Sequence, residues 1–156
     1  MPSTARILVI LSFGLLHAAC AGGPGSRIAE SGGASRAAYG YMADIRGAAG
    51  LARAVPDSRL ERAAEEQARL MAEAGRMAHT ARRGRDFTSR MRANGIGGKA
   101  AENIANGRMP MTEVFDMWKA SPPHRRNMLD PAFTRYGLAS ATTAEGRRYW
   151  ALVLAN

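Results

Sequence analysis

The stretch RYWALVLA, from Arg148 to Ala155, decides the fold, because every residue after the first is apolar or aromatic. Its length and its aromatic and branched residues predict a β-strand. Successive side chains of a strand point to opposite faces, so Tyr149 and Val153 lie on one face and Trp150 and Leu152 on the other. Both faces are therefore apolar, and such a strand must be covered on both sides by other elements.

The preceding sequence supplies the covering layers. A strand-like run from Tyr136 to Ala141 is joined to the last strand by a turn around Glu145 and Gly146. Before it come five segments with helical patterns: about Arg36 to Ala49, Ser58 to Ala74, Phe87 to Asn94, Glu113 to Lys119, and a helix that begins at Pro122. Helices that precede a doubly apolar strand predict an α+β fold, a three-layer α/β/α sandwich with a small, largely antiparallel central sheet.

Three of these helices begin next to residues that favour helix starts. Ser58, with Glu61 three residues later, predicts a capping box at the second helix. Thr112 is predicted to cap the fourth helix, and Ser121 is predicted to cap the fifth helix, which has Pro122 at its first position.

The N-terminus is typical of an export signal. Residues 1–20 hold a positive start, a ten-residue apolar run and a small-residue exit, which predict a secretory or lipoprotein signal peptide. Cys20, the only cysteine, follows two alanines and resembles a lipoprotein cleavage site, where the cysteine is acylated and becomes the first residue. Ordinary cleavage after Ala21 fits the same residues, and the mature chain would then start at Gly22.

This N-terminus predicts the location and the domain organisation. We expect an extracytoplasmic protein, either a periplasmic or outer-envelope lipoprotein attached to the membrane through Cys20 or, alternatively, a secreted protein. Residues 21–35, AGGPGSRIAESGGAS, have no apolar period and predict a flexible tether. One domain over residues 36–156 fits the remaining length.

The formal net charge of +9 comes almost entirely from arginine, with twenty Arg against two Lys. Such an excess fits binding to phosphate groups of nucleic acids or of anionic lipids. It fits equally a compositional preference for Arg over Lys in a chain rich in Ala, Gly and Arg, and we favour this second interpretation over nucleic-acid binding. The chain carries no nucleic-acid-binding motif, so nucleic acid is not an expected partner.

Few residues of the mature chain are candidates for a functional site. His79 and His124 are the only histidines after the signal peptide, and Glu102 is a carboxylate that enters an apolar segment and needs a partner. His124 falls in the first turn of its helix, where the helix dipole favours a neutral ring. The spacing of these residues matches no standard metal motif, and the mature chain offers neither a G-x-S-x-G elbow nor a cysteine nucleophile.

Two motifs, taken in their order along the chain, indicate a site that the spacing alone does not. The first motif is Glu102-Asn103-Ile104-Ala105-Asn106-Gly107, the second is Trp118-x-x-Ser121-Pro122-x-His124, and a Tyr-Trp strand comes last. Over about residues 39–155 this order resembles the CAP superfamily, the SCP-like group of cysteine-rich secretory, antigen 5 and pathogenesis-related proteins, in its short bacterial form. The resemblance implies an α/β/α sandwich with a central cleft lined by two histidines and two acidic residues, which binds a divalent cation in some members.

The resemblance assigns roles residue by residue. It implies that His79 and His124 are the metal ligands, and that Glu102, Asn103 and Ser121 belong to the cleft. Members with the complete set of four carry a glutamate where this chain has Ser121, so we expect only weak binding of a zinc-like divalent cation.

Three functions fit these residues. The first is a binding module of the cell envelope whose cleft recognises a lipid, glycan or protein ligand. The second is a metal-dependent hydrolase or peptidase with Glu102 as the catalytic base, and the third is a phosphate or nucleic-acid binder that uses the arginines. We favour the binding module, because an enzyme needs a nucleophile or a firmly held metal; whether the protein has any catalytic activity stays open.

Overall fold

The computed structural model describes residues 26–156. The predicted signal peptide, Cys20 and the first residues of the predicted tether lie outside the described residues. Ten elements follow in chain order: β1 Ile28–Gly33, α1 Tyr39–Gly47, β2 Val55–Pro56, α2 Ser58–Ala74, α3 Phe87–Ala93, β3 Ala100–Gly107, α4 Met111–Ala120, α5 Pro122–Met128, β4 Arg135–Thr143 and β5 Arg148–Ala155.

The strands form one small sheet in the order β1-β4-β5-β3, with the short β2 paired beside β4. All pairs are antiparallel except the pair of β2 with β4. The last strand, β5, therefore lies between β4 and β3 inside the sheet. This arrangement confirms the predicted largely antiparallel sheet.

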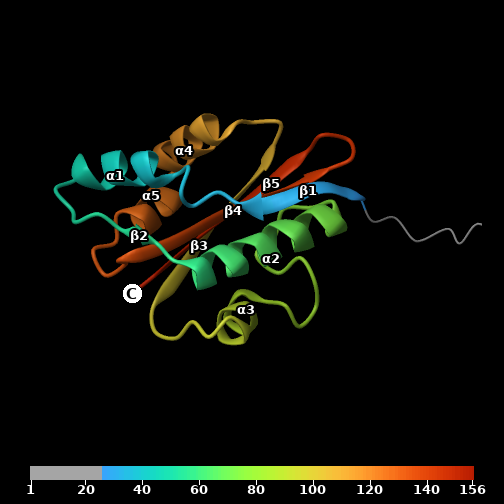
Figure 1. Cartoon of the computed structure of the whole chain (residues 1–156), viewed down its shortest axis with the longest axis horizontal. Coiled ribbons are helices and arrows are strands. Elements are labelled where there is room, and N and C mark those ends of the chain that lie inside the picture. Colours follow the sequence, from blue (N-terminus) through green and yellow to red (C-terminus); the bar gives the residue numbers. More distant parts are fainter. Residues whose placement is uncertain (1–25) are drawn as a thin grey trace, which may run out of the picture.

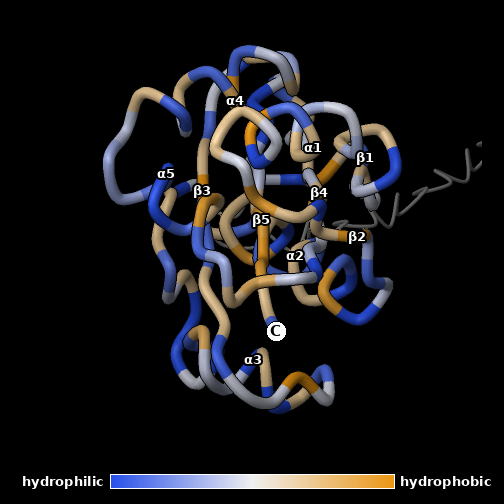
Figure 2. The backbone as a smooth tube through the Cα atoms, turned by 90° about the vertical axis from the view of Figure 1, so that its left-hand side faces the viewer, coloured by the Kyte–Doolittle hydropathy of each residue, from blue (hydrophilic) through white to orange (hydrophobic). Residues whose placement is uncertain are grey.

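Helices cover both faces of this sheet (Figure 1). One core joins Tyr149, Ala151, Val153 and Ala155 of β5 to the buried face of α2, and a second core joins Trp150, Leu152 and Leu154 to α1, α4 and α5. Figure 2 shows the apolar central strands between the two helical layers. The two faces of β5 thus pack as the alternation of its side chains predicts, and the three-layer sandwich is confirmed.

The tether prediction is wrong for residues 28–33, which form strand β1. This strand pairs with β4 through backbone hydrogen bonds, and Ser31 Oγ donates to Glu65 Oε1 at 2.9 Å. Backbone pairing needs no apolar side chains, which explains why a segment of Gly, Ser and Ala is ordered here. The folded domain therefore includes residues upstream of Arg36.

The predicted helix starts need three corrections. Asp57, and not Ser58, caps α2 by accepting hydrogen bonds from the backbone N–H groups of Arg59 and Leu60. The carboxylate of Glu61 instead accepts from the backbone N–H of Ser35, so no capping box forms. Helix α4 begins at Met111, before Thr112, and Ser121 precedes α5 without a side-chain cap hydrogen bond.

Two further differences concern element boundaries. Helix α1 covers only Tyr39–Gly47 of the predicted segment, and β3 was not predicted as a strand.

In residues 26–156, no helix is both long enough and apolar enough to cross a membrane.

Gly137 marks a close approach between β4 and α2. A Cβ atom at this position would lie 2.1 Å from the backbone atoms of Leu60 and Glu61. We expect Gly137→Ala to lower the free energy of unfolding by about 3 kcal/mol, because backbone atoms cannot move aside as a flexible side chain can. Urea denaturation measures this loss. Gly32→Ala is the matched control, since nothing lies within 4 Å of its added Cβ, and an equal cost for both variants would contradict the prediction.

Tyr136 ties β4 to the segment before α1, because its hydroxyl donates to the backbone carbonyl of Ser35 at 2.8 Å. Burial raises the pKa of Tyr136 to about 12. In the unfolded chain this phenol ionises near pH 10, so its contribution to stability is complete below pH 10 and is lost as the pH rises towards 12. Between pH 10 and pH 12 we expect the free energy of unfolding to fall by roughly 2 kcal/mol more in wild type than in Tyr136→Phe. Urea denaturation at a series of alkaline pH values tests this, with Tyr39→Phe as the exposed control; parallel losses in all three proteins would contradict it.

Candidate functional site

Strand β3 presents two neighbouring site residues to opposite faces of the sheet. Glu102 faces the layer of α2 and α3, and Asn103 faces α5. Both are buried, at 7 % and 0 % exposure. Each side chain therefore needs hydrogen-bond partners from the layer that it meets.

The carboxylate of Glu102 is held between two basic groups. Its Oε1 lies 2.8 Å from Nδ1 of His79, and its Oε2 lies 2.5 Å from Arg90. A carboxylate only accepts hydrogen bonds, so Nδ1 of His79 is the donor. Both oxygens of Glu102 are thereby engaged.

Arg90 is the site residue that sequence reasoning missed. Its side chain is fully buried, and besides Glu102 it donates to the backbone carbonyls of His79 and Arg85 at 2.9 and 2.8 Å. It thus fixes both the carboxylate and the loop that carries His79. The apolar surroundings of Glu102 signalled that a cation was needed, but the sequence offers many arginines and no sign of which one is close.

Asn103 connects β3 to α5. Its side-chain nitrogen donates to the backbone carbonyl of His124 at 3.0 Å, and its side-chain oxygen accepts from Asn127 at 2.8 Å. The indole N–H of Trp118 donates to the backbone carbonyl of Ile104 at 3.3 Å. These hydrogen bonds fix α4 and α5 against the free edge of β3 and so set the position of His124.

His124 lies near Trp118, with 6.4 Å between the ring centroids. Burial lowers the pKa of His124, and the positive charge that His79 can carry lowers it further. Its Nδ1 is buried and has no hydrogen-bond partner among the described residues. The neutral ring that the helix position predicts is thus favoured also by burial.

The remaining predicted residue, Ser121, lies between α4 and α5 and is half-buried. In residues 26–156 its hydroxyl takes part in no capping hydrogen bond. It stands three residues before His124 in the chain.

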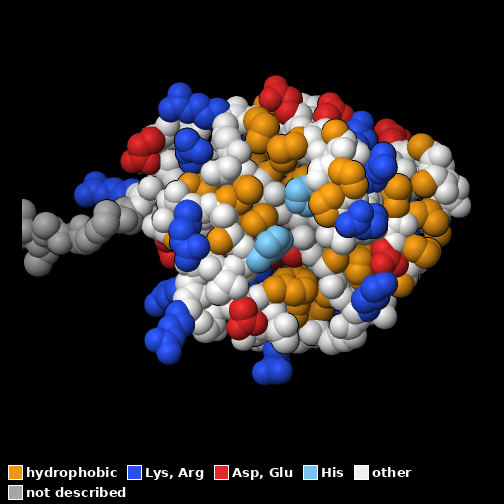
Figure 3. Space-filling view, turned by 180° about the vertical axis from the view of Figure 1, so that it is seen from behind, with side chains coloured by type: hydrophobic (Ala, Val, Ile, Leu, Met, Phe, Trp, Pro, Cys, Tyr) orange, Lys and Arg blue, Asp and Glu red, His pale blue; other side chains and the backbone are white. Residues whose placement is uncertain are grey.

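The site is open to solvent. Figure 3 shows the two histidine side chains close together on one face of the molecule, and the side chain of His79 is 57 % exposed. A groove of about 700 Å³ lies elsewhere, between α2 and the loop that contains Arg82 and Arg83. The polar site at the edge of β3 is hereafter called the histidine site (His79, Glu102 and His124).

The histidine site fits a divalent cation only in part. Nδ1 of His79 is used by Glu102, and Nδ1 of His124 is buried, so the Nε2 atoms are the nitrogens left to bind a metal. Among residues 26–156, no three His, Cys, Asp or Glu side chains are grouped as metal ligands. A cation held here would have two imidazoles and water as ligands, with Glu102 orienting one ring, and it would supply Lewis-acid chemistry.

Comparison with known families identifies the fold. Residues 39–154 match the sequence profile described as CAP, the Cysteine-rich secretory protein family. This match covers most of the chain, so the protein belongs to the CAP family. A search of curated proteins found no match.

Solved structures show the same fold at low sequence identity. An outer surface protein of Borrelia burgdorferi superposes with a TM-score of 0.70 at 21 % identity, covering 76 % of this chain and 89 % of the other. An extracellular SCP-domain protein of Bacillus anthracis gives 0.68 at 20 %, covering 78 % and 40 %. A cysteine-rich secretory protein of Staphylococcus aureus gives 0.61 at 16 %, covering 77 % and 37 %. The chain thus spans about two fifths of the last two proteins.

The buried pair of Arg90 and Glu102 is expected to stabilise the domain only as a pair. Arg90→Met should lower the free energy of unfolding by about 3 to 5 kcal/mol, because it leaves a buried carboxylate without its arginine and beside a solvent-exposed histidine. The double variant Arg90→Met/Glu102→Gln should cost less than the sum of the two single changes, since the charge leaves with its partner. Urea denaturation of the three variants measures the coupling.

Arg92→Met is the control for this cycle, because Arg92 lies on the same helix and is exposed. Its effect should stay within about 0.5 kcal/mol. Strictly additive costs of the Arg90 and Glu102 changes would contradict the prediction.

Proposed function

We propose that this CAP protein is an extracytoplasmic binding module whose histidine site recognises a lipid, glycan or protein ligand and binds a divalent cation weakly. The observation that carries the proposal is the double engagement of Glu102 by Arg90 and His79. A carboxylate in this state orients His79 and offers no free oxygen for abstracting a proton. The site therefore suits recognition better than hydrolysis.

The neighbouring groups support the same function. His79 exposes its ring to solvent, and the ring of His124 lies beside the buried Trp118. A ligand at this surface would meet one exposed and one half-buried imidazole above a rigid strand edge. Rigid support of this kind lowers the entropic cost of binding.

The metal-dependent hydrolase is the alternative. It would need Glu102 to act as the base on a metal-bound water, and that role requires the carboxylate to separate from Arg90 or His79. It would also need a firmly held cation, whereas Ser121 stands where members with the complete set of four carry a glutamate. Both requirements weigh against hydrolysis.

The extracytoplasmic location in this proposal rests on two observations. The family of this chain is described as secretory, and two of the structural neighbours are described as extracellular or outer-surface proteins. The start of the sequence has the pattern of an export signal. Lipid attachment at Cys20 stays a prediction.

Ligand titration with detection at the two rings tests the binding function. Stearic acid and soluble peptidoglycan fragments are added separately while the imidazole NMR signals of His79 and His124 are recorded. We expect one probe to shift these signals without being consumed, and expect His79→Ala to weaken that binding about tenfold or more. His124→Ala should act in the same direction. Turnover of a peptide or ester that a chelator abolishes would contradict the binding function and favour the hydrolase.

Calorimetric titration of zinc into the metal-free protein at neutral pH tests the cation site separately. Each of His79→Ala and His124→Ala should lower the affinity about tenfold or more, and Ser121→Glu should raise it by adding an anionic ligand. Circular dichroism checks that each variant is folded. Equal zinc binding by wild type and the double histidine variant would remove the metal site and leave the ligand-binding test unaffected.

A further inference from the structure

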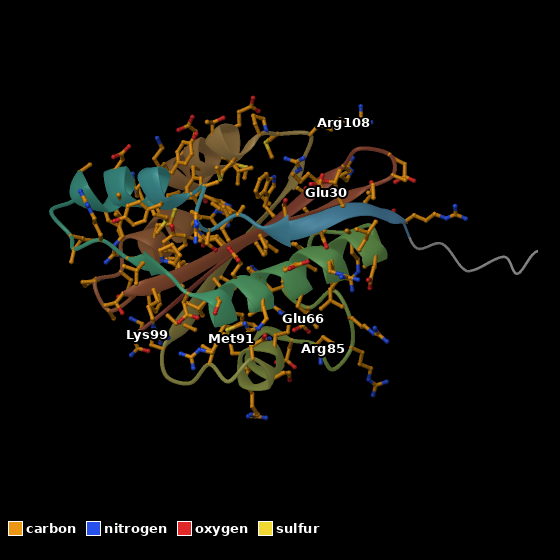
Figure 4. The ribbon with its side chains drawn as sticks, in the orientation of Figure 1. Glu30, Glu66, Arg85, Met91, Lys99 and Arg108 are labelled. Atoms are coloured by element: carbon orange, nitrogen blue, oxygen red, sulfur yellow. The ribbon has the colours of Figure 1, made fainter. Side chains whose placement is uncertain are left out.

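One end of the sheet collects arginines from distant parts of the chain. At this end β1 starts, β3 stops and β4 turns into β5: the backbone N–H of Ala144 donates to the carbonyl of Arg27 at 2.8 Å, and Arg108 donates to the carbonyl of Glu145 at 2.8 Å. Helix α2 ends at the same place, since a Cβ on Gly75 would lie 3.8 Å from Ser26 Oγ. Figure 4 shows Arg108 above this hairpin.

We call this surface the basic end. It comprises Arg27, Arg76, Arg82, Arg83, Arg108, Arg147 and Arg148. Six of the seven are exposed, and the half-buried Arg148 packs over the ring of Trp150. Arg82 and Arg83 belong to it because Arg76 donates to the carbonyls of Thr80 and Ala81, immediately before them.

The charges of the basic end are not neutralised locally. None of the ion pairs found in residues 26–156 uses any of these seven arginines. The opposite end of the sheet differs, because there Lys99 pairs with Asp130 and Arg135 with Asp57. The acidic residues near the seven arginines are Glu30, Glu73 and Glu145, together with Glu65 and Glu66 on the groove that Arg82 and Arg83 line. Glu66 already pairs with Arg85, which is not one of the seven. The basic end thus keeps a positive excess.

The chain enters the domain at this end. Ser26 is the first described residue, and Cys20, the predicted lipid attachment site, precedes it by six residues. Six residues reach at most about 20 Å. An acyl chain on Cys20 would hold this end, and not the histidine site on a side face, near the bilayer surface.

We propose that the basic end docks on an anionic phospholipid surface and acts as a second membrane contact beside the N-terminal anchor. A lipid anchor and a basic patch are two separate signals for membrane attachment, and together they fix which face of a protein meets the bilayer. Unpaired arginines attract anionic headgroups over about a Debye length. In this orientation the opposite end of the sheet points away from the bilayer.

Vesicle co-sedimentation of the exported Cys20→Ser chain tests the docking without an acyl chain. The vesicles contain either phosphatidylcholine alone or phosphatidylcholine mixed with phosphatidylglycerol. We expect binding only to the anionic vesicles, and a decrease with added salt. The triple variant Arg27→Gln/Arg83→Gln/Arg147→Gln should bind them about tenfold or more weakly. None of these three side chains makes a hydrogen bond or an ion pair among the described residues, so folding should be unchanged.

The matched control replaces three exposed arginines elsewhere, Arg36, Arg53 and Arg92, by Gln. It removes the same charge and should bind anionic vesicles with at least threefold higher affinity than the basic-end variant. This ratio corresponds to a difference of about 0.6 kcal/mol in binding free energy. Equal losses in both triple variants would overturn the proposal, because net charge would then explain binding. Equal binding to both vesicle types would also overturn it, as would tighter, arginine-dependent binding to a short DNA duplex.

Discussion

The fold depends on the position of β5, which has apolar side chains on both faces and strands on both edges. Exposing either face to water would cost the burial of several large side chains, among them Trp150 and Leu152. Helix α2 therefore has to cover one face, and α1, α4 and α5 the other. The close backbone contact at Gly137 shows how tightly α2 approaches the sheet.

The histidine site follows from where β3 lies in this sheet. As an edge strand, β3 pairs with β5 on one side only. The indole of Trp118 in α4 donates to the backbone carbonyl of Ile104, and the side chain of Asn103 donates to the backbone carbonyl of His124 in α5. Alternation along β3 then places Glu102 and Asn103 in different layers, so each layer supplies one histidine. The same alternation buries Glu102, and a buried carboxylate is tolerable only because Arg90 accompanies it.

The charges of the protein are organised by the same topology. Strand ends, the β4–β5 turn and the end of α2 meet at one place, and the arginines near them form the basic end. At the opposite end, carboxylates such as Asp57 accept both helix-capping and ion-pair contacts. The domain is thus polarised along its strands, and the histidine site lies between the two ends on the free edge of β3.

The sequence by itself determined the sandwich and the family, because periodicity and the two central motifs are local properties that can be seen in the order of the residues alone. It also indicated His79 and His124, the only histidines after the signal peptide, and Glu102, a carboxylate that enters an apolar segment. The strands β1 and β3, the partner Arg90 and the basic end were decided only by tertiary structure. Edge pairing, burial and ion pairing depend on residues far apart in the chain, and one arginine among twenty carries no local mark of its partner.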